Sequence, residues 1–202
     1  MCATKTLVLD SIMTEGLSFE DLCSLFVVSL LAKAHAYVDG PLNKYQRSRL
    51  CESMTADIRK LCDMAFPAAR SFLVSAAAKD LADATGLDLR HVTWHSQKKI
   101  DGYKTFTYEH LYPVREIRLA LAKTADREEA LEVLDRMLWV AWVTKQEDKR
   151  LRDLGFASVR EHPFEAYEQA GIELLSDADV LGLPQVWLTL GVDGSQAASA
   201  VA

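Results

Sequence analysis

The last fifth of the chain has no positive charge. Residues 161–202 contain seven Asp or Glu and neither Lys nor Arg, and the whole chain carries a net charge of −6. A general nucleic-acid coat protein needs positive charge to neutralise phosphates, so the composition argues against that class. Basic residues are in slight excess only over residues 86–160. We interpret this middle part either as ordinary solvent-exposed charge or as a local surface that holds a phosphate.

Paired cysteines and long apolar runs are also missing. The four cysteines form no Cys-x-x-Cys pair, which argues against a zinc knuckle and is typical of a reducing compartment. The longest apolar stretch, residues 25–31, is far shorter than a bilayer span, and residues 1–10 lack the pattern of a signal peptide. The sequence contains no Gly-rich phosphate loop, nucleophile elbow or His-Glu-x-x-His motif. We therefore expect a cytoplasmic protein without a membrane segment.

Helical patterns cover the first 86 residues. Ser18 followed by Asp21 predicts an N-cap, and the helix that it begins should end near Asp39-Gly40-Pro41. A second apolar stripe at 3/4 spacing predicts a helix over 44–65. Pro67 is typical of a first helical position and predicts a third helix that ends at Thr85-Gly86. These three helices would form an antiparallel bundle over 18–86.

Strand-forming residues appear after residue 87. Asp101-Gly102 between two such runs is a strong signal for a two-residue turn and predicts a β-hairpin over 92–110. Helices should follow from Pro113 and from a Thr124 cap. Residues 138–143 fit a buried strand or a continued helix; we favour the strand because Thr144 and Glu147 form a capping box that begins a new helix.

The predicted fold is α+β and mainly helical, with an N-terminal three-helix bundle packed on a small antiparallel sheet and further helices. We expect one domain over 1–192. It would consist of the bundle 18–86, a hairpin–helix unit 87–160 and an acidic C-terminal segment 161–192, followed by a flexible tail over 193–202.

The predicted hairpin brings three histidines together. With the turn at 101–102, residue 95 pairs with 108 and residue 93 with 110, so His91, His95, Tyr108 and His110 share one face. His91 and His95 are then diagonal neighbours of His110. A one-residue slip in the turn would disperse this cluster, and histidines on a hairpin also occur as structural residues.

Such a cluster predicts two kinds of chemistry. His91, His95 and His110 could hold one divalent metal ion, zinc or magnesium, with a position open for water. Alternatively, His110 could act as a general base beside Glu109 as ligand or orienting group. A phosphodiester substrate would be held by the cations around the cluster: Arg90, Lys98, Lys99, Lys104, Arg115 and Arg118.

Two segments carry a resemblance. Phe106–Pro113 contains Tyr-Glu-His-x-x-Pro, and Val143–Leu151 contains Thr-Lys-x-Glu-Asp before a leucine and Gly155. These pieces, about a third of the chain, resemble a scattered group of uncharacterised bacterial and mobile-element proteins, which implies that Glu109-His110 belongs to a shared unit. The order strand, turn, strand, helix also resembles ββα-metal nucleases, in which a strand histidine, here His95 or His110, activates water. The helix after Pro113 departs from that pattern because it offers Glu116 and no histidine.

Two functional hypotheses follow. The first is a metal-assisted nuclease of a bacterial defence or mobile-element system, which would bind nucleic acid through the basic region 87–118. The second is a non-catalytic protein-binding module, such as an antitoxin, immunity or inhibitor protein. In that case the acidic segment 161–192 would bind a basic protein partner, and the histidines would be structural.

Overall fold

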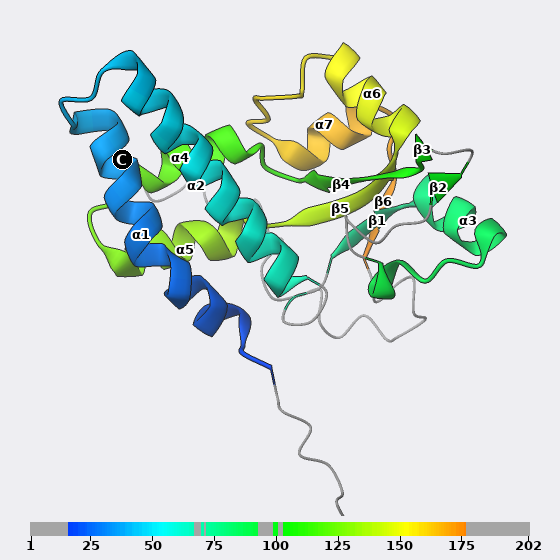
Figure 1. Cartoon of the computed structure of the whole chain (residues 1–202). Coiled ribbons are helices and arrows are strands. Elements are labelled where there is room, and N and C mark those ends of the chain that lie inside the picture. Colours follow the sequence, from blue (N-terminus) through cyan, green and yellow to red (C-terminus); the bar gives the residue numbers. More distant parts are fainter. Residues whose placement is uncertain (1–15, 67–69, 71, 93–98, 101–102, 177–202) are drawn as a thin grey trace, which may run out of the picture.

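The computed structural model describes residues 16–66, 70, 72–92, 99–100 and 103–176. This part of the chain forms the predicted α+β fold, mainly helical with a small sheet (Figure 1). The helices are α1 (Phe19–Asp39), α2 (Lys44–Ala65), α3 (Ala76–Thr85), the 3-10 helix η1 (Leu89–His91), α4 (Val114–Leu121), α5 (Arg127–Met137), α6 (Lys145–Asp153) and α7 (Pro163–Gln169). The strands are β1 (Leu73–Ser75), β2 (Lys99–Ile100), β3 (Tyr103–Lys104), β4 (Phe106–His110), β5 (Val140–Thr144) and β6 (Leu174–Ser176).

The first two helices begin as their sequences predict. The Ser18 hydroxyl accepts a hydrogen bond from the Asp21 amide at 3.1 Å, and the Asp21 carboxylate accepts one from the Ser18 amide at 3.3 Å. Asn43 and Gln46 form a second capping box at the start of α2. Each box satisfies backbone N–H groups that have no partner inside the helix.

The bundle differs from the predicted one. Residues 73–75 form β1 instead of helix, and α3 begins only at Ala76, with Ser75 as its N-cap. Helix α3 packs on β1 and β5, whereas α1 packs against α2, α4 and α5. The predicted end of the third helix at Thr85-Gly86 is confirmed, but its predicted start was wrong, because strand pairing of residues 73–75 with β5 and β6 overrides the local helix signal.

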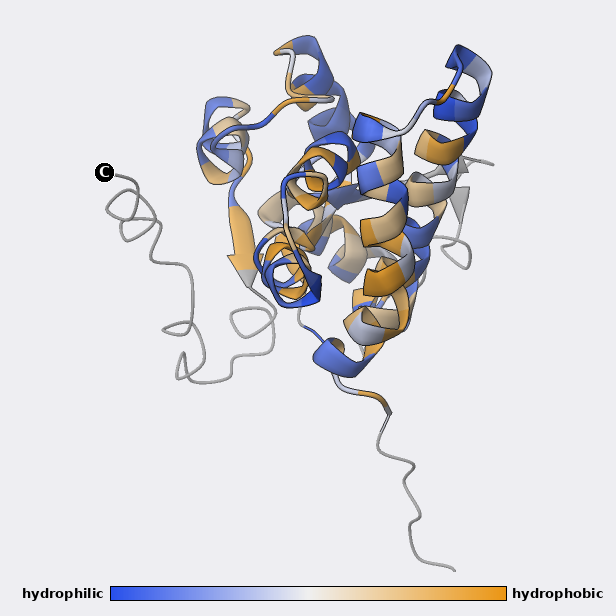
Figure 2. Ribbon diagram, turned by 90° about the vertical axis from the view of Figure 1, so that its left-hand side faces the viewer, coloured by the Kyte–Doolittle hydropathy of each residue, from blue (hydrophilic) through white to orange (hydrophobic). Residues whose placement is uncertain are grey.

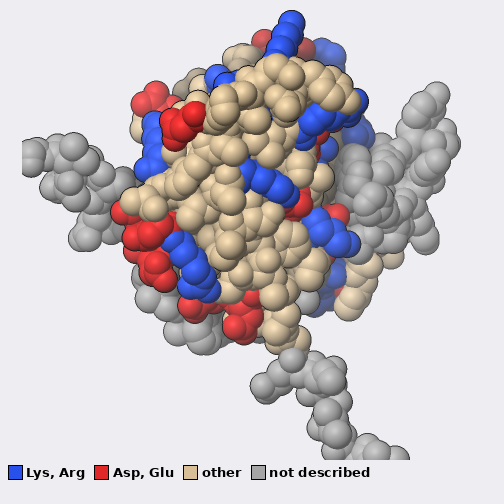
Figure 3. All heavy atoms as spheres, turned by 60° about the vertical axis from the view of Figure 1, so that its left-hand side comes forward, with Lys and Arg blue, Asp and Glu red and all other residues tan. Residues whose placement is uncertain are grey.

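Helix α1 has both a buried and an exposed side. Leu22, Cys23, Val27, Leu30 and Ala34 lie in the core, and apolar residues run along the helices of this layer (Figure 2). By length and composition alone, α1 could cross a membrane, a test that core helices of soluble proteins also pass. On its outer side Leu25 and Val28 are 63% and 64% exposed. Figure 3, turned toward the helical side of Figure 1, shows a broad and mostly uncharged area that a few Lys and Arg side chains interrupt.

The main sheet is mixed, in the order β4-β5-β1-β6. Strand β5 runs antiparallel to β4 and parallel to β1, and β6 is antiparallel to β1. The predicted sheet was antiparallel, whereas β1 and β5 are parallel. A parallel pair needs a long crossover connection, and the chain between β1 and β5 is long enough to provide one. The strand predicted over 138–143 is confirmed as β5, whose central position explains its continuous apolar sequence.

Residues of β5 point alternately into two cores. Val140 and Trp142 belong to the core between the sheet and the helices α1, α2, α4 and α5. Ala141 and Val143 belong to a smaller core on the other face, together with Leu151 of α6 and Tyr167 of α7. In the described residues, α1, α2, α4 and α5 together with the shorter α3 therefore cover one face of the sheet, and α6 with α7 cover the other.

The predicted hairpin is only partly described. Ile100 pairs with Tyr103 and Lys99 with Lys104, the register expected for a two-residue turn at 101–102. The predicted pairs that involve residues 93–98 fall outside the described residues. In the part that is described, β4 pairs with β5, with Tyr108 opposite Trp142 and His110 opposite Val140. His91 is not on a strand, since it ends the 3-10 helix η1.

The later helices follow the sequence closely, with one exception. Helix α6 begins at the predicted capping box, where the Thr144 hydroxyl accepts a hydrogen bond from the Glu147 amide at 3.2 Å. Helix α5 is capped by Asp126, whose carboxylate accepts from the Glu129 amide at 3.0 Å. The Thr124 hydroxyl instead donates to the Leu121 carbonyl, so the predicted Thr124 cap was wrong.

Candidate functional site

The two predicted catalytic residues, Glu109 and His110, point to opposite faces of β4. His110 points toward α2, where its Nδ1 lies 3.6 Å from the Cys62 Sγ. Glu109 points toward the layer of α6 and α7 and meets the Arg160 guanidinium at 2.5 Å. Successive side chains of a strand alternate between faces. The two residues therefore belong to separate surroundings and do not form one catalytic pair.

The surroundings of His110 keep its imidazole uncharged. Burial, with the positive charges of Arg59 and Arg160, lowers the pKa of His110 to about 4. Cys62 is 1% exposed, and burial raises the pKa of its thiol well above the usual range. A neutral imidazole beside a protonated thiol is a hydrogen-bonded contact between β4 and α2. It is the arrangement expected of a structural histidine.

This pKa predicts a pH dependence of stability. Above the ordinary histidine pKa of about 6.5, the imidazole is neutral in the folded and unfolded chains, and its contribution is complete. As the pH falls from there toward 4, the unfolded chain takes up a proton that folded His110 does not, so the free energy of unfolding decreases. In urea unfolding at about pH 7 and about pH 5, His110→Asn should lose less stability than the wild type. An equal loss of unfolding free energy in both proteins would show that His110 is not the group responsible for the pH dependence.

Arg160 is a buried side chain at this site that makes hydrogen bonds to several partners. It is 2% exposed, and its guanidinium donates to the Glu109 carboxylate. Three further N–H donors bond the backbone carbonyls of Phe156 at 2.7 Å, His110 at 2.7 Å and Leu111 at 3.2 Å. Burial raises the pKa of Glu109, and Arg160 acts in the opposite direction. No local sequence pattern marks Arg160, because its partners are about fifty residues away in the chain.

The two segments that carry the resemblance meet on this face of the sheet. The Thr107 hydroxyl donates to the Asp148 carboxylate at 3.3 Å, and Asp148 also pairs with Arg152 at 3.2 Å. The Glu147 carboxylate, 3% exposed, accepts from the Ser75 hydroxyl at 2.6 Å and from the Thr144 amide at 2.8 Å. The bonds to Ser75 and Thr107 attach α6 to β1 and β4. The bonds between Thr144 and Glu147 confirm the predicted helix cap.

The predicted metal ligands are only partly placed. The His91 side chain is 83% exposed, and its Nε2 lies 3.7 Å from the Asp88 carboxylate. His95 lies outside the described residues. Within residues 16–176, as far as they are described, no three His, Cys, Asp or Glu side chains are arranged to hold a metal ion. The predicted metal site therefore depends on His95 and stays a prediction.

The predicted phosphate-binding cations lie on different elements. Arg90 pairs with Asp88, and these hydrogen bonds lower the pKa of the Asp88 carboxyl to about 2. Arg115 is exposed on α4, whereas Arg118 is partly buried and donates to the Cys51 carbonyl at 3.2 Å. Lys98 lies outside the described residues, and only the backbone of Lys99 and Lys104 is described.

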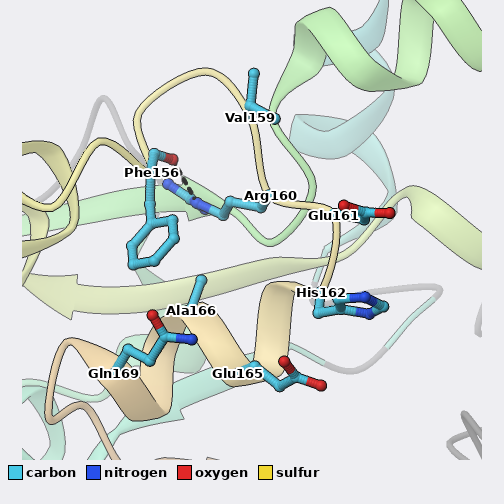
Figure 4. Close-up of a pocket in the computed structure, with 8 residues that line it drawn as sticks. All are labelled: Phe156, Val159, Arg160, Glu161, His162, Glu165, Ala166 and Gln169. Carbon is cyan, nitrogen blue, oxygen red and sulfur yellow. Dashed lines mark hydrogen bonds between the residues drawn. The ribbon is translucent and has the colours of Figure 1, made fainter.

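A shallow pocket lies where the segment 156–162 passes α7 (Figure 4). Its volume is about 250 Å³. Its walls combine apolar side chains with two exposed carboxylates, and the residues are Phe156, Val159, Arg160, Glu161, His162, Glu165, Ala166 and Gln169. The sequence predicted an acidic surface here but not a pocket, because residues 156–160 and α7 approach each other only in the fold.

Comparisons with family models, curated proteins and solved structures gave no significant match to this chain.

Proposed function

We propose that this chain is a non-catalytic protein-binding module that docks a basic protein partner on its α7 surface. We define the α7 surface as Val159, Glu161, Phe164, Glu165 and Glu168. The observation that carries the proposal is the pairing of exposed apolar and acidic side chains around a pocket: Val159 is 50% and Phe164 46% exposed beside three exposed glutamates.

Charge and apolar area have separate roles in such an interface. Aromatic and aliphatic side chains that are exposed in the free protein supply contact area when a partner covers them. Glutamates around them attract a positively charged partner and repel an acidic one. No Lys or Arg occurs from residue 161 to residue 176, so this segment has no cation of its own to oppose a basic partner.

The surroundings of the predicted catalytic residues also favour binding over catalysis. Glu109 is engaged by the buried Arg160, and His110 by the buried Cys62. A general base needs a pKa near the operating pH and access to the substrate. The lowered pKa of His110 does not meet the first requirement, and its half-buried imidazole is held against the buried Cys62 of α2. A metal-assisted nuclease remains the alternative, and it needs His95 as a ligand.

Charge reversal on α7 should weaken binding of a basic peptide. The probe is a fluorescein-labelled peptide of alternating lysine and leucine, with its glutamate-for-lysine counterpart as the negative probe. Replacing Glu165 and Glu168 together by Lys should raise the dissociation constant roughly tenfold or more at low salt, since attraction becomes repulsion. Fluorescence anisotropy measures both constants.

The matched control carries the same charge change on another helix. Glu128→Lys with Glu132→Lys alters two exposed glutamates of α5 and should leave the dissociation constant within about twofold. If both double variants weakened peptide binding equally, the effect would be due to net charge alone and the proposal would be wrong. Cleavage of supercoiled DNA by the wild type with zinc or magnesium, lost in His110→Gln, would replace the proposal by the nuclease.

A further inference from the structure

We infer that the pocket beside α7 receives one basic side chain, a lysine or an arginine, from the partner. This inference rests on the proposed function and adds a specific anchor to it. Small-molecule pockets are usually roughly 300–1,000 Å³, and this one is about 250 Å³. The size suits a single side chain rather than a cofactor.

The pocket has an apolar side and an acidic side. In Figure 4 the ring of Phe156 lies at one end, Ala166 in the middle, and the carboxylates of Glu161 and Glu165 toward the other end. A lysine or arginine side chain has the matching order, with an aliphatic stem and a cation at its tip. The stem would lie across Phe156 and Ala166, and the cation would reach the two glutamates.

Arg160 lines the pocket without opposing a cation. Four of its five guanidinium N–H donors bond the Glu109 carboxylate and the backbone carbonyls of His110, Leu111 and Phe156. The Glu109 carboxylate, 2.5 Å away, balances its charge. Glu161 and Glu165 supply the negative charge at the rim, on either side of the His162 imidazole (Figure 4), so a basic side chain is favoured there over an acidic or a neutral one.

Peptides that differ at one central residue test the anchor. Each peptide is a short serine–glycine sequence that has one leucine at each end and lysine, arginine or norleucine in the middle. The peptides are titrated into the ¹⁵N-labelled full-length chain, and binding is followed by the amide chemical shifts of the protein. Lysine and arginine peptides should shift the amides of Ala166 and Gln169, and norleucine should bind more weakly because it keeps the stem and lacks the cation. Equal binding of the norleucine peptide would overturn the inference.

Two isosteric variants on one helix separate the anchor from the general charge of α7. Glu165 lines the pocket and Glu168 does not. Glu165→Gln should raise the dissociation constant of the lysine peptide by up to about fivefold, the upper end of the range for one exposed ion pair, while Glu168→Gln should leave it unchanged. Equal weakening by both variants would overturn the anchor and leave the proposed function standing. No weakening by either variant would contradict both.

Discussion

Arg160→Ala is expected to lower the free energy of unfolding by about 3 kcal/mol, the lower end of the cost of removing one partner from a buried ion pair, because Arg160 is buried but the Glu109 side chain is 22% exposed. The substitution leaves the Glu109 carboxylate without its cation, and burial already raises the pKa of that group. It also removes the donors that bond the carbonyls of His110, Leu111 and Phe156, which tie β4 to the segment before α7. Urea unfolding followed by circular dichroism measures the change.

Arg152→Ala is the matched control for this substitution. Arg152 is also paired with a carboxylate, that of Asp148 at 3.2 Å, but its side chain is 56% exposed. Exposed pairs contribute about 1 kcal/mol or less, so the control should change little. A double variant, Arg160→Met with Glu109→Leu, should recover part of the loss because no buried charge remains unpaired. Equal effects of Arg160→Ala and Arg152→Ala would show that burial of this pair has been misjudged.

Leu30→Ala is expected to cost about 2–5 kcal/mol, the range for truncating a buried leucine. Leu30 lies in the core between α1 and its neighbouring helices and is 0% exposed. Alanine there removes apolar contacts and leaves a cavity that the surrounding helices can fill only in part. Thermal and urea unfolding should both show the loss.

Leu25→Ala provides the comparison on the same helix. Leu25 is 63% exposed, and substitutions at such positions usually change stability by about 0.5 kcal/mol or less. The two variants have the same change in chemistry and similar helix propensity, so their difference reports burial alone. Should Leu25→Ala prove as costly as Leu30→Ala, the outer side of α1 must be covered in solution.

Local signals in the sequence predicted most of the helices. The capping residues Ser18 and Thr144 marked helix starts that the structure confirms, because cap and helix form within one turn of chain. Strand pairing was predicted less well. The short run Leu73–Ser75 has no alternation long enough to reveal a strand, and its identity depends on β5 and β6, which come much later in the chain.

The candidate site was less predictable than the fold. Glu109 and His110 stood out as neighbours in sequence, yet adjacent strand residues face opposite ways, and each met a partner from a distant segment. Arg160 and the pocket could not be foreseen, since both arise where residues 156–162 pass α7. The acidic character of residues after 161 could be foreseen, because charge composition does not depend on contacts.

The topology of the main sheet also bears on how the chain folds as it leaves the ribosome. Strand β1 has its parallel neighbour in β5, and more than sixty residues separate them. Helices α1 and α2 also precede α4 and α5 in the chain. They are therefore synthesised before the helices that pack against the core side of α1. During synthesis the apolar side of α1 is therefore exposed before its final neighbours are made, and such exposed apolar surface makes a nascent chain prone to aggregate.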